Sequence, residues 1–178
     1  MGRRRKSALM ATAYHEAGHA VIGNQLHIPL GKRGVTVIAK EGSYGSAHFP
    51  LKLPGKLGYT DTDGMRLAIE RHTLCFLAGL EAQRKYAPRS VRNYHAHSDY
   101  HSAVELVSDV IHDPDEQKHY FRFLGLRVRH MLELPHVWVQ VVAVADALAK
   151  AGTLSAKEVR SIMRDAVQSA TERFRSAH

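Results

Sequence analysis

Proline and glycine divide this chain into segments, and their positions constrain its fold more than any other feature, because both residues interrupt helices. Between them, apolar residues recur at helical spacing over several turns. The first such stretch covers residues 7–26 and stops before Pro29, and a second runs from about Asp63 to Tyr86, where Pro88 follows. We therefore predict two long helices in the first half of the chain.

The second half is also predicted to be helical. Its helix starts are indicated by N-terminal patterns in which a capping side chain or a proline precedes apolar residues. These patterns give helices from Ser98 to Val110, from Asp113-Pro114 onward, from Pro135 to Gly152, and from the capping box Ser155-Ala-Lys-Glu158 to about Arg173.

One short segment has β character. Val35–Ala39 is rich in β-branched residues, and Tyr44–Phe49 can pair with it through a turn around Gly42. Residues 50–62 contain several prolines and glycines, and they are predicted to form a loop. The predicted fold class is therefore mainly α, with a small β hairpin or mixed sheet after the first helix.

The composition is that of an ordinary globular protein, with 178 residues, 44% hydrophobic and 24% charged, which favours one domain. We assign this domain to residues 7–178 and a basic arm to residues 1–6. No apolar run approaches the roughly 18 residues that a bilayer span needs, so no membrane span is expected. The only cysteine, Cys75, is predicted to be a buried core thiol, and a lone cysteine fits a cytoplasmic location.

The net charge is +8, and four of the positive charges lie in Arg3–Lys6. Such an arm can attract nucleic acid, but more often it only contributes to a soluble surface, so nucleic acid is a hypothesis and not an expected partner. Histidine is more notable, because 13 residues of this type suggest metal or proton chemistry.

The strongest candidate site is His15-Glu16-Ala17-Gly18-His19, an HExxH pattern within the first predicted helix. Residues four apart lie on one helix face, so both imidazoles could bind one Zn²⁺, and Glu16 could contact water at the metal. Such a pattern also arises by chance in a histidine-rich chain. In that case the two histidines would be partly exposed and Glu16 would be a solvated charge.

A catalytic zinc site needs a third protein ligand. The metzincin continuation is excluded, because Ile22 and Gln25 occupy the positions of its glycine and third histidine. Spacing alone leaves five other candidates open: Glu81, Asp99, His95, His97 and His101.

Several segments together resemble the peptidase domain of FtsH-like, ATP-dependent membrane zinc proteases. The resemblance spans nearly the whole chain, and its strongest part is the segment that carries the HExxH pattern. The similar segments are Thr12-Ala-Tyr-His-Glu-Ala-Gly-His-Ala-Val21, Val35-Thr-Val-Ile38 with Gly45, Leu77-Ala-Gly79 with Glu81-Ala82, Ser98-Asp-Tyr-His-Ser-Ala103, Ala147-Leu148, and Thr153-Leu154-Ser155 with Glu158-Val159.

The resemblance implies a helical zinc-peptidase domain in which His15, His19 and Asp99 are the metal ligands and Glu16 is the catalytic base. The chain departs from the family at Leu80 and Gln83, where the family has arginine and glutamate. We expect that an ion pair or hydrogen bond supporting the site is missing there.

The family's motor has no counterpart in this sequence, since no G-x-x-x-x-G-K-[ST] motif occurs. We expect an ATP-independent zinc metalloendopeptidase that cleaves unfolded or flexible polypeptides, and a homo-oligomer is compatible with the sequence. Its substrate is expected to pair with the strand formed by Tyr44, Gly45, Ser46, Ala47, His48 and Phe49. The alternative is a zinc-binding adaptor or regulatory protein that is catalytically weak.

Overall fold

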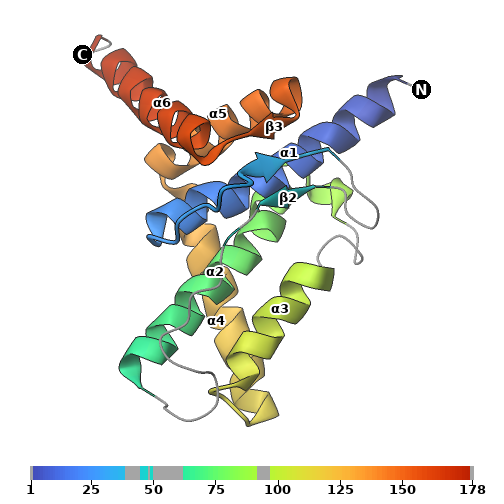
Figure 1. Ribbon diagram of the computed structural model, residues 1–178, viewed down its shortest axis with the longest axis vertical. Helices are drawn as coiled ribbons and strands as arrows, with labels where there is room; N and C mark the ends of the chain where they lie inside the picture. The colour runs from blue at the N-terminus through green and yellow to red at the C-terminus, as the bar shows by residue number, and fades with distance from the viewer. Residues whose placement is uncertain (1, 39–44, 48, 50–61, 92–96, 177–178) are drawn as a thin grey trace.

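The computed structural model describes residues 2–38, 45–47, 49, 62–91 and 97–176, with side chains described from Lys6 onward and without that of His97. Within these ranges the chain is mainly helical, with a small antiparallel sheet, as predicted (Figure 1). The elements in chain order are α1 (Gly2–Gln25), β1 (Val35–Thr36), β2 (Ser46–Ala47), α2 (Asp63–Tyr86), a 3-10 turn (Pro88–Ser90), α3 (His97–Ser108), α4 (Pro114–Glu133), α5 (Pro135–Ala151), β3 (Thr153–Leu154) and α6 (Ala156–Ser176).

Helix α1 is the central element, and most of its side chains between Ala11 and Gly23 are buried. Its sequence permits this, because the buried positions around the helix carry small or apolar residues, among them Ala13, Ala17 and Ile22. It packs against α2 and α5 and also contacts β1 and β2 (Figure 1). The HExxH segment therefore lies inside the fold.

Helices α1 and α2 approach closely at Gly18. A Cβ atom added to Gly18 would lie 2.6 Å from both the carbonyl oxygen of Ala78 and Cβ of Ala82. Small residues on both helices thus allow the two backbones to approach. This crossing fixes where the rest of α2 lies along α1.

The short strands connect a segment that follows α1 with a segment between α5 and α6. The sheet order is β2-β1-β3, both pairs are antiparallel, and the register places Val35 opposite Ala47 on one side and Leu154 on the other. Gly34 precedes β1 with φ of 65° and lies against the carbonyl of Leu154, where no side chain would fit. The predicted pairing of the two segments after α1 is therefore confirmed, and β3 is a third strand that the sequence did not indicate.

Helix ends agree closely with the capping patterns. Asp113 accepts a hydrogen bond from Glu116 N, and Ser155 and Glu158 form both hydrogen bonds of the capping box. Gly152 ends α5 with φ of 76°. Ser98 is not an N-cap, because α3 already begins at His97.

The start of the first helix differs from the prediction, whereas the position of the cysteine agrees with it. Helix α1 begins at Gly2, so the basic residues predicted as a separate arm continue the first helix. Cys75 is buried within α2, as predicted, and its thiol donates a weak hydrogen bond to the carbonyl of His19 at 3.6 Å. Among the described residues, no single helix has both the length and the apolar composition needed to cross a membrane.

We predict that Gly18→Ala destabilises the protein by about 1–3 kcal/mol, because the new methyl group must force α1 and α2 apart. Gly64→Ala is the matched control, since its nearest neighbour, Thr62 Oγ1, would lie 3.9 Å from the added Cβ. That change is expected to be neutral or slightly stabilising. Urea denaturation of both variants measures the difference, and equal stability would contradict the close crossing.

Candidate metal centre

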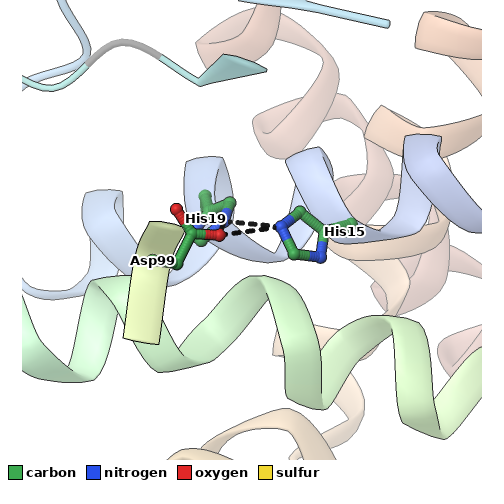
Figure 2. Close-up of side chains that lie close together, drawn as sticks. All are labelled: His15, His19 and Asp99. Atoms are coloured by element: carbon green, nitrogen blue, oxygen red, sulfur yellow. Dashed lines mark hydrogen bonds and ion pairs between the residues drawn. The ribbon is translucent and has the colours of Figure 1, made fainter. Parts of the chain in front are cut away.

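His15 and His19 lie one turn apart on α1 and point to the same side of the helix (Figure 2). Both are nearly inaccessible, with exposed fractions of 8% and 6%, and their Nε2 atoms are 3.1 Å apart. Glu16 is also buried, with an exposed fraction of 5%. The arrangement expected of a chance pattern, with exposed histidines and a solvated glutamate, is therefore wrong.

Asp99 approaches the two imidazoles from the first turn of α3. Its Oδ2 atom lies 3.0 Å from His15 Nε2 and 3.2 Å from His19 Nε2 (Figure 2). One ligand atom from each of the three residues lies within 4.8 Å of the others. His15, His19 and Asp99 thus form a group that could hold a metal ion, and imidazole with carboxylate suits several divalent metals.

Residues of helix α2 orient both imidazoles through hydrogen bonds with their Nδ1 atoms. His15 Nδ1 contacts Gln83 Oε1 at 3.1 Å, and His19 Nδ1 contacts the carbonyl oxygen of Cys75 at 2.8 Å. Both partners are acceptors, so each Nδ1 carries the hydrogen and donates it. Each Nε2 is then left to face Asp99, which is the usual arrangement of metal-binding histidines.

Gln83 is itself held in place. Its exposed fraction is 2%, and its amide nitrogen donates to the carbonyl oxygen of Ser90 at 3.3 Å and to Ser90 Oγ at 3.2 Å. The amide orientation is therefore fixed, with Oε1 turned towards His15. The expectation that a supporting hydrogen bond is missing at Gln83 is wrong, because a neutral amide supplies that hydrogen bond. Leu80, the other departure, is half-buried.

Gly79 leaves the space that His19 occupies. A Cβ atom added to Gly79 would lie 2.2 Å from His19 Nε2, which no side-chain rotation of a methyl group could relieve. The glycine in the Leu77-Ala-Gly79 segment is thus required by the imidazole that packs on it. The sequence identified the Leu77-Ala-Gly79 segment, but it did not show that His19 packs on this glycine.

The three groups shift one another's pKa. Burial lowers the pKa of His15, and this outweighs its hydrogen bond with Asp99. Burial alone would also lower the pKa of His19, but the charge and hydrogen bond of Asp99 raise it well above its usual value. Burial opposes ionisation of Asp99, yet the adjacent imidazoles hold its pKa well below the usual range. Both pKa shifts favour an ion pair between a cationic His19 and an ionised Asp99.

Glu16 lies between this group and strand β2. Burial raises its pKa to about 7, although the charge of His19 opposes the shift. Its Oε1 atom points towards Gly45, where an added Cβ atom would lie only 2.7 Å away. Glu16 is thus a buried carboxyl group next to an outer strand of the sheet.

Of the other candidates for a third ligand, the two whose side chains are described, Glu81 and His101, do not join the group. Glu81 forms ion pairs with Arg84 and with Arg129, the latter at 3.2 Å. His101 is exposed and lies 3.5 Å from Glu105 on its own helix. His95 and the side chain of His97 lie outside the described residues.

Part of the predicted substrate segment can also be located. Gly45, Ser46, Ala47 and Phe49 are described, and Ser46 and Ala47 form β2. Phe49 packs against the backbone of α1, since a Cβ atom added to Gly23 would lie 2.6 Å from its ring. Tyr44 and His48 lie outside the described residues.

Comparisons with protein-family models and with curated protein sequences found no match for this chain.

We predict that Asp99→Ala weakens zinc binding by roughly 100-fold or more, because it removes one of three donor groups. Glu81→Ala should leave zinc affinity within about threefold of the unmodified protein, since Glu81 contacts arginines and not the histidines. Competition with a chromophoric chelator measures both affinities. Loss of zinc by Glu81→Ala with retention by Asp99→Ala would overturn the ligand assignment.

Metal binding at pH 7 should release more than one proton, because His19 must give up its proton to become a ligand and Glu16, with a pKa of about 7, ionises fully beside the cation. The pKa of His19 is raised, so apparent metal affinity should increase with pH up to that pKa and then level off. Asp99 is already ionised and His15 already neutral, so neither adds to the release. Calorimetric titrations in two buffers of different ionisation enthalpy measure the proton number, and identical heats in both would contradict it.

Proposed function

We propose that this protein is an ATP-independent zinc endopeptidase that cleaves unfolded or flexible polypeptides. The observation that carries the proposal is the position of Glu16, a buried carboxyl group beside the His15, His19 and Asp99 group and facing β2. A purely structural metal needs only its ligands. A buried carboxyl group without such a task is costly, and strongly perturbed carboxyl groups gather at functional sites.

The donor set supports zinc as the metal. Two imidazole nitrogens and one carboxylate oxygen are typical of catalytic zinc sites, which keep a further position for water or substrate. The resemblance to FtsH-like peptidases, with the same three ligands, supports the same choice. When bound, zinc would polarise the scissile carbonyl and make the attacking water more acidic.

The chain's own residues would carry the proton. Glu16 accepts a proton from the attacking water and returns it to the leaving amine, as one carboxyl group can serve as base and then as acid. Its pKa of about 7 in the protein alone suits this exchange near neutral pH. A nearby divalent cation favours the ionised form, so the base is ready when the metal is bound.

Strand β2 supports an extended polypeptide as the substrate. It is an outer strand of the sheet, and Gly45 at its start lies against Glu16. Main-chain pairing with an extended peptide would bring the peptide past Glu16, and such pairing is largely independent of side-chain identity. A flexible chain meets this requirement, whereas a folded protein does not. No phosphate-binding motif for ATP occurs in the 178 residues, and the cleavage that we propose uses no nucleotide.

Glu16→Gln tests the proposal. The amide cannot accept the water proton, so we predict that cleavage of a reduced and alkylated unfolded protein falls by roughly 100-fold or more. Zinc content should not change, because Glu16 is not in the ligand group. Zinc is measured by atomic emission and cleavage by gel electrophoresis without ATP.

The outcomes separate the two main functions. Cleavage by the unmodified protein alone supports the peptidase. Full zinc occupancy with no cleavage by either form would reject it and favour a zinc-binding adaptor or regulatory protein. Equal cleavage by both forms would also reject the role of Glu16.

A further inference from the structure

A pocket away from the candidate metal centre is lined by residues from the end of α1, from α5 and from α6. Figure 1 shows where these three helices lie. The volume of the pocket is about 580 Å³, within the range of roughly 300–1,000 Å³ typical of ligand pockets. None of its lining residues belongs to the His15, His19 and Asp99 group. We refer to it as the α6 pocket; it is lined by Asn24, Gln25, Gln140, Arg160, Met163, Arg164, Val167 and Gln168.

One face of α6 supplies most of the wall. The lining residues on this helix recur at intervals of three and four positions from Arg160 to Gln168, so they lie on the same side. Met163 is buried and Val167 is half-buried, which gives the pocket an apolar base. Arg160 and Arg164 are exposed at its edge, one helical turn apart. A ligand can therefore combine apolar contact with two positive charges.

The charges in the pocket are not neutralised by its own lining, because none of the lining residues is acidic. Among the described residues, Arg160 forms no ion pair, and Arg164 lies 3.6 Å from the exposed Asp165 and donates to Ser161 Oγ at 3.3 Å, both on its own helix. An exposed pair of this kind is weak, so Arg164 can exchange it for a ligand at little cost. Two guanidinium groups of this kind favour carboxylates or phosphates.

The remaining polar groups favour a peptide over a compact anion. Asn24 and Gln25 carry side-chain amides, each of which offers both a donor and an acceptor, whereas Gln168 Nε2 donates to Glu172 Oε1 at 3.0 Å on its own helix. Asn24 and Gln25 also form the last turn of α1, and the end of a helix carries partial negative charge. That charge opposes a phosphate placed there but attracts the N–H groups of a peptide backbone.

We propose that the α6 pocket binds a short acidic peptide segment of a partner protein. The carboxylates pair with Arg160 and Arg164, an apolar side chain covers Met163 and Val167, and the backbone pairs with the amides at the end of α1. The proposal does not depend on the proposed peptidase activity, because no metal ligand takes part.

The test uses a fluorescein-labelled peptide, Gly-Asp-Glu-Leu-Asp-Glu, and the 178-residue protein in a fluorescence anisotropy titration. We expect saturable binding that weakens at least about tenfold in Arg160→Gln and in Arg164→Gln, since one lost charge-assisted contact corresponds to about this factor. Both side chains are exposed, so these variants should fold normally, which circular dichroism can verify. The Asn and Gln analogue of the peptide should bind at least about tenfold more weakly.

Arg173→Gln is the matched control, because it removes the same charge from the same helix outside the pocket. It should change affinity by less than about twofold. An equal loss in Arg173→Gln would show general electrostatic attraction and overturn the proposal. So would the absence of saturable binding, or complete displacement of the peptide by millimolar inorganic phosphate, which would indicate a simple anion site.

Discussion

The close crossing of α1 and α2 is the constraint on which the candidate metal centre depends. Gly18 lets the two backbones approach, and Gly79 on the facing helix leaves space for the ring of His19. Because of this contact, α2 can also supply the acceptors that orient both imidazoles, from Gln83 and from the carbonyl of Cys75. The site is therefore a product of helix packing as much as of the HExxH pattern.

The same packing creates an electrostatic problem within the core. Helix α1 carries two imidazoles and a carboxyl group on a segment whose other side chains are mostly small and apolar. Isolated charges at such depth would be strongly disfavoured. Asp99 offsets the cationic form of His19, and a bound divalent cation would be offset by the same carboxylate. The charge of α3's first turn thus makes a buried cation tolerable, whether it is a proton or a metal ion.

Much of the fold follows from local sequence patterns. Prolines, glycines and capping residues determine where helices begin and end, and Asp113, Gly152 and Ser155 act as their positions predict. Strand β3 was not predicted, because a two-residue strand has no local pattern of its own and depends on β1 being nearby. The α6 pocket was also not predicted, since its lining comes from three helices whose relative orientation is a tertiary property.

In the candidate site, too, some features follow from local sequence patterns and others depend on tertiary contacts. The spacing of His15 and His19 within one helix was sufficient to predict that they act together. The residues alone could not choose Asp99 over Glu81, because that choice depends on which helix face turns towards α1. From the sequence, Gln83 was noted only as a difference from the FtsH-like peptidases that the chain resembles. Its hydrogen bond to His15 needs the fixed amide orientation that Ser90 provides, and this is a matter of three-dimensional contacts.

The pairing of β1 with β3 has a consequence for how the protein is made. Val35 pairs with Leu154, and α1 packs against α5. The first helix can therefore complete its packing only after most of the chain has been synthesised. A nascent chain that has reached α3 already contains all three candidate ligands. It still exposes the apolar side of α1 that α5 will cover. During synthesis, then, the segment that carries the candidate centre exposes apolar surface that can aggregate, until the C-terminal helices cover it.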